Sequence, residues 1–375
     1  MYDVIVLGGG AGGIVCAGKC ALGGKSVLLL ESGERIGRKI LMSGNGRCNL
    51  SNINVAPDKY NRPDFVRAAI EKYGAKQITD FFESINLLCR SDTEGRIYPH
   101  SMSAGSVLNA LCDWLNKSGC DIALGCTAQD IRCRDGVYYV QCNSATYSAK
   151  CVVLACGSAA GGGKNSYSIL QAFNIKTTAL SSALTYIKTP DFKGLKGVKA
   201  KVKIKVTAGG AIHESLGEIL FRDDGISGIA AFWASTFIAR NNGGDIEIDF
   251  APEYSKEKLL SVYGGKGAES LRGLLHRALS DRLATISKSA GADGVIPLIK
   301  SYKFKAKTLG DIKDCQVVCG GLDTSQWDSY TLSSKRYPNL YCIGEMLDID
   351  GECGGYNLHW AWASAMTAAE DIVSD

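Results

Sequence analysis

The N-terminal segment constrains the fold most, because it carries a strand, a glycine turn, a helix and a second strand in order. An apolar run at 2–7 leads into a Gly-x-Gly-x-x-Gly motif at 8–13, and a second apolar run at 26–30 ends at Glu31. Continuous apolar runs of this length are typical of parallel strands buried on both faces. The segment therefore predicts an α/β fold built on a Rossmann-like sheet.

The same segment predicts a bound dinucleotide. Gly8 permits a tight turn, Gly10 lets the backbone approach a pyrophosphate, and Gly13 lets the helix pack close to the strand. The helix N-terminus offers amide hydrogens and partial positive charge to phosphates. Glu31 can accept hydrogen bonds from both hydroxyls of an adenosine ribose. The alternative is a glycine-rich turn that binds nothing.

The segment that follows Glu31 indicates which dinucleotide binds. Residues 35–52 are rich in Gly and Asn and carry the cations Arg35, Arg38, Lys39 and Arg47. An irregular basic segment of this kind suits an extended ligand, because amides and cations can line its path. FAD is such a ligand, and the alternative is a solvated basic loop.

Length and composition exclude several classes of protein. A chain of 375 residues is expected to form two or three domains. The net charge of +4 is nearly balanced and gives no nucleic-acid footprint, and four histidines are too few for a histidine metal site. The 15 cysteines show no Cys-x-x-Cys spacing. No apolar run is long enough to span a membrane, and no signal-peptide pattern is present. We expect a cytoplasmic protein with buried thiols, no metal and no nucleic-acid partner.

The middle of the chain divides into a cofactor half and an insert. A hairpin at 127–143 feeds a buried strand at 150–155 that ends near Gly157, which is typical of the second half of a two-sheet FAD domain. The block at 181–309 instead shows antiparallel strands and helices without a cofactor motif. We expect an FAD domain at 1–180 and 310–375 and an insert at 181–309, with its helical part at about 228–290.

The C-terminal region returns to the cofactor domain. A strand at 340–343 ends in Gly344 and Glu345, and Gly354 and Gly355 precede a long helix. The acid can bind ribityl hydroxyls, the glycine turn lets amides approach the isoalloxazine, and the helix N-terminus can face the ring edge where negative charge gathers. Helices are also expected at 64–73, 75–86, 103–117, 228–240, 255–263 and 268–289, and strands at 121–126, 198–206, 212–221 and 314–319.

The chain resembles FAD-dependent flavoproteins of the dehydro-bile-acid reductase and aminoacetone-oxidase-like group. The resemblance rests on the motifs at 37–49, 95–99, 217–228, 319–321 and 344–362. It implies an FAD domain carrying an insert that is part antiparallel and barrel-like and part helical. The chain departs from the group at 155–158, where Ala-Cys-Gly-Ser replaces Ala-Thr-Gly-Gly, and at 161–166.

The motifs and the resemblance together define an expected site for FAD, bound non-covalently. The residues expected to bind it are Gly8, Gly10, Ala11, Gly12, Gly13, Glu31, Ser32, Arg38, Lys39, Ser43, Gly44, Arg47, Cys48, Asn49, Ala128, Ala155, Gly157, Gly344, Glu345, Gly354, Gly355, Tyr356, Asn357 and Leu358.

The resemblance favours hydride transfer from flavin N5 to a carbon–carbon double bond conjugated to a ketone, in a small apolar substrate such as a steroid or bile acid. Two alternatives stay open: a flavin amine oxidase, and an FAD-binding protein with a sensory or RNA-associated role and no turnover. A second Gly-x-Gly-x-x-Gly unit is absent, so NAD(P)H would bind transiently, or ferredoxin would supply electrons.

Four residues are candidates for catalysis. Arg47 can stabilise an enolate or the reduced flavin, and Tyr356 can donate a proton. Tyr98 and His100 are weaker candidates next to a motif of the group. The alternatives are pyrophosphate binding for Arg47, packing for Tyr356 and a plain surface position for His100.

Overall fold

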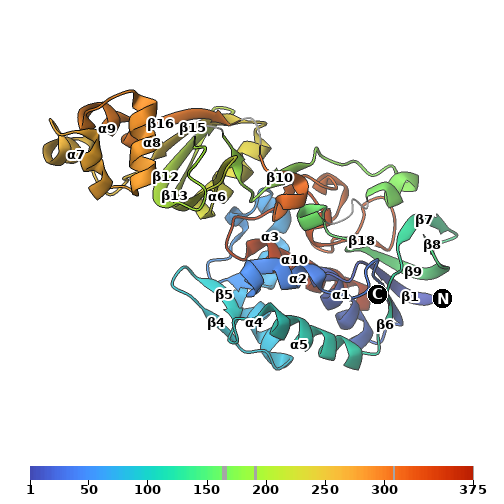
Figure 1. The fold of residues 1–375 in the computed structure, drawn as a ribbon. Helices are drawn as coiled ribbons and strands as arrows, with labels where there is room; N and C mark the ends of the chain where they lie inside the picture. The colour runs from blue at the N-terminus through green and yellow to red at the C-terminus, as the bar shows by residue number, and fades with distance from the viewer. Residues whose placement is uncertain (163–166, 190–191, 307–308, 375) are drawn as a thin grey trace. The chain divides into compact units, whose positions relative to one another are not determined.

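The computed structural model describes residues 1–162, 167–189, 192–306 and 309–374. The chain forms two compact units, and Figure 1 shows their elements. The first unit comprises Met1–Ala159, Gly163–Leu180 and Gly320–Asp375, and the second comprises Ala160–Gly162 and Ser181–Cys319.

The first unit is built on a seven-stranded sheet. Its parallel strands are β1 (Tyr2–Leu7), β2 (Val27–Leu30), β6 (Asp121–Ala123), β9 (Thr146–Leu154) and β18 (Leu340–Cys342), and a hairpin of β7 (Ala128–Arg134) and β8 (Val137–Cys142) continues it antiparallel to β9. The order is β6-β2-β1-β9-β8-β7, with β18 also paired to β9. The central strand β1 is apolar because both of its faces are covered, and Ile5 and Val6 have no exposed surface.

Helices from the two ends of the chain pack together on this unit. The helix α1 (Ala11–Leu22) contacts α10 (Tyr356–Ser374) and α5 (Ala104–Lys117). The approach of α1 to α10 is close, because a Cβ at Gly12 would lie 3.1 Å from the carbonyl oxygen of Ala361. Trp360 and Trp362 of α10 are buried in the core. This packing brings the first and last sequence motifs into one unit.

A second, three-stranded sheet with order β3-β5-β4 completes the first unit. Its strands are β3 (Ser51–Asn52), β4 (Cys89–Ser91) and β5 (Arg96–Pro99). The other helices of the first unit are α2 (Arg38–Met42), α3 (Pro63–Lys72) and α4 (Ala75–Ser84). Its 3-10 turns are η1 (Ser43–Gly46), η2 (Pro57–Lys59), η4 (Tyr167–Phe173), η7 (Thr324–Gln326) and η8 (Gly344–Met346).

The second unit is centred on a six-stranded antiparallel sheet with order β11-β14-β13-β12-β15-β16. A bridge joins Ile187 of the edge strand β11 to Leu309, which follows the other edge strand β16 in the sequence, so the sheet is nearly closed and barrel-like. The strands are β11 (Ile187–Lys188), β12 (Lys199–Ala208), β13 (Ala211–Phe221), β14 (Gly225–Ser227), β15 (Gly244–Asp249) and β16 (Tyr302–Ala306), and β10 (Ser181–Ala183) pairs separately with β17 (Val317–Cys319). With this unit, the predicted fold class, a Rossmann-like sheet with an antiparallel insert, is confirmed.

The helices of the second unit correct two expectations. They are α6 (Ile229–Arg240), α7 (Lys256–Tyr263), α8 (Arg277–Ser287) and α9 (Ala292–Lys300), with the 3-10 turns η3 (Ala160–Gly162), η5 (Ala268–Gly273) and η6 (Ile312–Asp314). The single helix expected at 268–289 is wrong, because His276 caps a new helix by accepting from the Ala278 amide at 3.2 Å. The range 228–290, expected to be the helical part of the insert, also contains the strand β15. The helix α9 lies just after this range.

Two predicted strands are also too long. Strand β6 ends at Ala123 rather than residue 126, because the Gly125 and Cys126 amides bond across to the Gly33 and Glu31 carbonyls. The strand expected at 314–319 begins only at Val317, since η6 precedes it.

Candidate functional site

The glycine loop after β1 is built so that side chains are excluded on one side and space is left on the other. Gly8 has φ +108°, and a Cβ there would collide with the Ala155 backbone. A Cβ on Gly13 would collide with the Gly8 carbonyl oxygen. By contrast, a Cβ on Gly10 would meet no atom within 4 Å. The open position lies at the N-terminus of α1, where Ala11 begins the helix without a side-chain cap.

Glu31 fixes the glycine loop, a role that sequence reasoning missed. Its Oε2 accepts from the Gly9 amide at 2.9 Å and its Oε1 from the Gly33 amide at 2.6 Å. Its carbonyl accepts from the Cys126 amide at 2.8 Å. The exposed Ser32 hydroxyl donates to Oε1 at 3.3 Å. The carboxylate is thus held at the end of β2, beside the loop.

The predicted residue Ala128 lies at the start of β7, two residues after Cys126. Ala155 follows β9 and donates its amide to the Leu7 carbonyl at 2.9 Å. Each has only a methyl side chain, so any hydrogen bond to a ligand would come from its backbone.

A second cluster joins three segments that are distant in sequence. The Lys39 ammonium donates to the Ser158 carbonyl at 2.6 Å, and the Ser158 hydroxyl donates to Glu345 Oε2 at 2.9 Å. Gly157 lies between them: with φ +69°, its Cβ would be 3.8 Å from Lys39 Nζ and 4.0 Å from Glu345 Oε2. Gly344 anchors the turn, donating its amide to Ser364 Oγ at 3.0 Å. Ser158 was not predicted from the sequence.

The basic loop between α2 and β3 is an irregular turn. Gly44 and Cys48 both have positive φ, at 56° and 58°. Cys48 has no exposed surface, and burial raises the pKa of its thiol to about 12 although the Ser43 hydroxyl opposes this. Arg38 at the start of α2 and Arg47 are exposed.

This loop is bonded to the C-terminal glycine turn. Asn52 Nδ2 donates to the Gly354 carbonyl at 3.0 Å. The side-chain nitrogen of Asn49 faces the carbonyls of Ser51 and Ile97. Its side-chain oxygen accepts a hydrogen bond from the backbone amide of Gly355 at 3.1 Å. A Cβ on Gly355, whose φ is +102°, would collide with the Ser51 carbonyl. Motifs from opposite ends of the chain thus form one structure.

The first turn of α10 has side chains with structural contacts. Asn357 Oδ1 accepts from the Gly351 amide at 2.9 Å, and its Nδ2 donates to the Gly351 carbonyl at 3.0 Å. Leu358 packs partly buried against the core. Tyr356 is 6 % exposed, and Tyr60 donates its hydroxyl to the Tyr356 carbonyl at 2.9 Å.

The candidate proton donors differ in their surroundings. Burial, with help from the charges of Glu352 and Asp58, raises the pKa of Tyr356 to about 12. Burial also raises the pKa of Tyr98, although the positive charges of Arg96 and Arg47 oppose it. Both phenols therefore keep their protons at neutral pH, and Tyr98 lies within reach of the Arg47 charge.

His100 is exposed and donates its backbone amide to the Leu88 carbonyl at 2.8 Å. Its neighbour in sequence, Pro99, belongs to β5 and pairs with Cys89. No side-chain bond ties His100 to the glycine loops within the described ranges.

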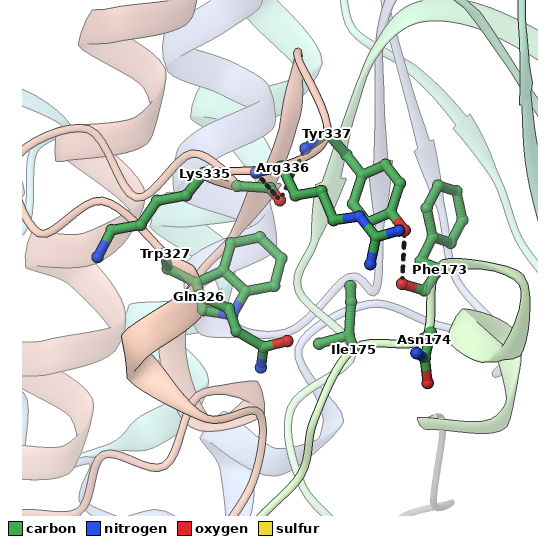
Figure 2. Close-up of a pocket in the computed structure, with 9 residues that line it drawn as sticks. Phe173, Asn174, Ile175, Gln326, Trp327, Lys335, Arg336 and Tyr337 are labelled. Carbon is green, nitrogen blue, oxygen red and sulfur yellow. Dashed lines mark hydrogen bonds between the residues drawn. The ribbon is translucent and has the colours of Figure 1, made fainter.

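A cavity of about 210 Å³ lies elsewhere in the first unit. Figure 2 shows Trp327, Arg336, Tyr337 and Phe173 around it, with the Tyr337 hydroxyl donating to the Phe173 carbonyl at 2.7 Å. The residues 334–337 precede β18, whereas the cofactor loops follow the carboxyl ends of the strands. The cavity is therefore separate from the predicted cofactor site.

In the described part of the chain, no group of three or more His, Cys, Asp or Glu residues is arranged to hold a metal ion. None of the helices in those ranges has the length and apolar character needed to cross a membrane.

Comparison with protein families identifies the chain. A family model described as "HI0933-like protein Rossmann domain" matches residues 2–371. The chain belongs to this family. The resemblance predicted from the motifs is confirmed, since the 3-dehydro-bile acid delta(4,6)-reductase of Clostridium scindens is 30% identical over 98% of each chain.

Other relatives carry a different name. The ribosomal RNA dihydrouridine synthases of Haemophilus influenzae and Escherichia coli are 29% and 26% identical, over 98% and 100% of this chain and 98% of their own lengths. With the family and the bile-acid reductase relative, the predicted enzyme class, a flavin-dependent oxidoreductase, is confirmed.

Solved structures share the fold. The 3-ketosteroid delta1-dehydrogenase of Sterolibacterium denitrificans, in complex with 1,4-androstadiene-3,17-dione, has a TM-score of 0.53 at 14% identity and covers 100% of this chain and 99% of its own. A flavocytochrome c3 fumarate reductase has a TM-score of 0.51 at 13% identity, over 100% of this chain and 78% of its own.

Proposed function

We propose that the chain is an FAD-dependent reductase that saturates a carbon–carbon double bond conjugated to a carbonyl group. The observation that carries the cofactor assignment is the placement of two carboxylates, Glu31 and Glu345, just beyond the carboxyl ends of β2 and β18. These parallel strands have β1 and β9 between them. Three strand spacings of about 4.8 Å separate the two ends by about 14 Å, which suits an extended dinucleotide.

The residues between the two carboxylates fit FAD. The space at Gly10 and the N-terminus of α1, which no side chain caps, offer a cradle for the pyrophosphate. The Lys39 ammonium can add a charge-assisted hydrogen bond to a phosphate. Glu31 would receive the ribose hydroxyls, and Glu345 the hydroxyls of the ribityl chain.

Bound FAD supplies hydride chemistry at its N5 atom. The chain must then polarise the substrate carbonyl and deliver a proton to the α-carbon. We assign carbonyl polarisation to Arg47, which is exposed and close enough to act on Tyr98. We assign proton donation to Tyr98, because Tyr356 is more deeply buried and its surroundings indicate packing.

The relatives support this bond type. A 3-dehydro-bile acid with double bonds at positions 4 and 6 has an alkene conjugated to a ketone. The uracil ring of uridine has its 5,6 double bond conjugated to a carbonyl, and this is the bond that is saturated in dihydrouridine. The reaction of an amine oxidase involves no carbon–carbon double bond conjugated to a carbonyl group.

We favour a small apolar enone, such as a steroid or bile acid, because the bile-acid reductase relative is the more similar one. The dihydrouridine synthases support a second candidate, a uracil base in RNA, with the same chemistry. In either case we propose that the second unit is the substrate domain, and that NAD(P)H or ferredoxin reduces the flavin transiently.

The cofactor assignment is tested by denaturing the purified protein and identifying what it releases. We expect free FAD. Flavin left on the polypeptide would contradict non-covalent binding, and FMN would contradict the role of Glu31. Anaerobic titration with NADH, NADPH and reduced ferredoxin then identifies the electron donor.

A further inference from the structure

Ser158 contacts a cation and an anion at once. It follows β9 and is 2% exposed. Its hydroxyl donates to Glu345 Oε2 at 2.9 Å, while its carbonyl accepts from Lys39 Nζ at 2.6 Å. One buried residue therefore binds a carboxylate with its side chain and an ammonium with its backbone.

This arrangement keeps the two charged groups apart although they are neighbours. A Cβ placed on Gly157 would lie within 4.0 Å of both Lys39 Nζ and Glu345 Oε2. In the part of the chain that the structure describes, no ion pair joins Lys39 to Glu345. The Ser158 hydroxyl holds Oε2 of Glu345, so Oε1 of this partly exposed side chain is available to a ligand.

We propose that Ser158 is a positioning residue that fixes Glu345 for a hydroxyl of the ribityl chain and prevents its collapse onto Lys39. The proposal rests on the proposed function, because the ligand is FAD. Without the Ser158 hydroxyl, rotation of Glu345 would let the carboxylate pair with Lys39. The carboxylate would then be withdrawn from the ligand.

A double-mutant cycle on FAD affinity tests this proposal. The dissociation constant is measured on apoprotein by quenching of flavin fluorescence for the wild type, Ser158→Ala, Glu345→Gln and the double variant. We expect Ser158→Ala to weaken binding about tenfold in the wild type, on the scale of a hydrogen bond to a charged group. In the Glu345→Gln background the same change should have an effect of less than about twofold, because Ser158 acts through the carboxylate.

Two further variants complete the test. Ser158→Thr retains the hydroxyl and should bind FAD within about threefold of the wild type. Ser118→Ala, which removes a hydroxyl with local bonds at the end of α5 (Ser118 Oγ donates to the Leu115 carbonyl at 2.7 Å and accepts from the Cys120 amide at 3.4 Å), should leave affinity unchanged. Equal losses in both backgrounds, or wild-type affinity in Ser158→Ala, would overturn the proposal. Wild-type protein that binds no FAD would instead refute the proposed function.

Discussion

At the scale of single residues, the site depends on carboxylates that are held by backbone amides and hydroxyls. Glu31 accepts from the Gly9 and Gly33 amides, and Glu345 accepts from Ser158. Such contacts orient an acid before a ligand arrives, which reduces the entropy that binding must overcome. The candidate site is therefore preorganised at both ends.

Glu31→Ala should weaken FAD binding by about one to two decades, since hydrogen bonds to charged groups contribute about 1.5–3 kcal/mol each. The matched control is Glu34→Ala, an exposed acid in the same turn. The measurement is the FAD dissociation constant of the apoprotein. Equal affinity in Glu31→Ala and the wild type would refute the adenosine-end assignment.

Tyr98→Phe should slow the proton-coupled step by about two decades or more, the usual contribution of a general acid. Tyr356→Phe should change the rate only slightly. The rate of reoxidation of the reduced, FAD-loaded enzyme by substrate is the measurement. The opposite ranking of the two variants would return proton donation to Tyr356.

We expect the buried His359 to make the free energy of unfolding depend on pH. It has no exposed surface, its Nδ1 lies 2.7 Å from Ser51 Oγ, and burial lowers its pKa from 6.5 to about 4, with the Tyr73 carbonyl opposing the shift. The unfolded chain therefore binds this proton more tightly. The free energy of unfolding should fall as pH drops from about 6.5 toward 4, by about 2 kcal/mol between pH 7 and pH 5.

Urea unfolding at the two pH values, in the wild type and in His359→Gln, measures this contribution. The variant is expected to be less stable but to lose the part of the pH dependence that His359 causes. An identical pH dependence in both proteins would assign the titration to another group.

At the scale of elements, different glycines of the loop after β1 serve packing and ligand binding. Gly13 is packed against the Gly8 carbonyl, while Gly10 faces open space. Gly13→Ala should therefore force α1 away from β1 and cost about 1–3 kcal/mol, as overpacking does. Gly10 has φ −83°, which alanine can adopt, and a Cβ there would meet no other atom of the protein within 4 Å. The Gly10→Ala apoprotein should therefore keep its stability, but the methyl group would occupy the space proposed for the pyrophosphate and lower FAD affinity.

Thermal unfolding of the apoprotein and FAD titration of each variant check this contrast. Gly105→Ala serves as the control, because it lies in α5 and its Cβ would meet only Ser103 Oγ at 3.4 Å. A loss of apoprotein stability in Gly10→Ala equal to that in Gly13→Ala would show that both glycines serve packing alone.

The sequence predicted the elements whose residues follow a regular pattern. The N-terminal strand–turn–helix and the helix α10 were predicted because apolar periodicity and glycines mark them. It did not reveal α9, whose helical pattern is interrupted by Pro297, or the break at His276. The hydrogen bonds of Ser158 to Lys39 and Glu345 could not be predicted from the sequence either, because they form only where the ends of β9 and β18 meet α2 in space.

At the scale of the whole molecule, the family match spans both units, from residue 2 to 371. Every cofactor motif lies in the first unit, and the second contributes an antiparallel, barrel-like sheet and its own helices. The predicted cofactor residues and the insert therefore belong to separate units. The chemistry itself belongs to the flavin.

The most direct test of the proposed function is the reoxidation of anaerobically reduced, FAD-loaded protein. The reduced enzyme is mixed with a steroid 4-ene-3-ketone, with the corresponding saturated ketone and with a uridine-containing RNA, and flavin absorbance and products are followed. We predict rapid reoxidation by the conjugated alkene, formation of the saturated product and no reaction with the saturated ketone. A flavin that stays reduced, with neither the enone nor the uracil base saturated, would contradict the proposed reductase.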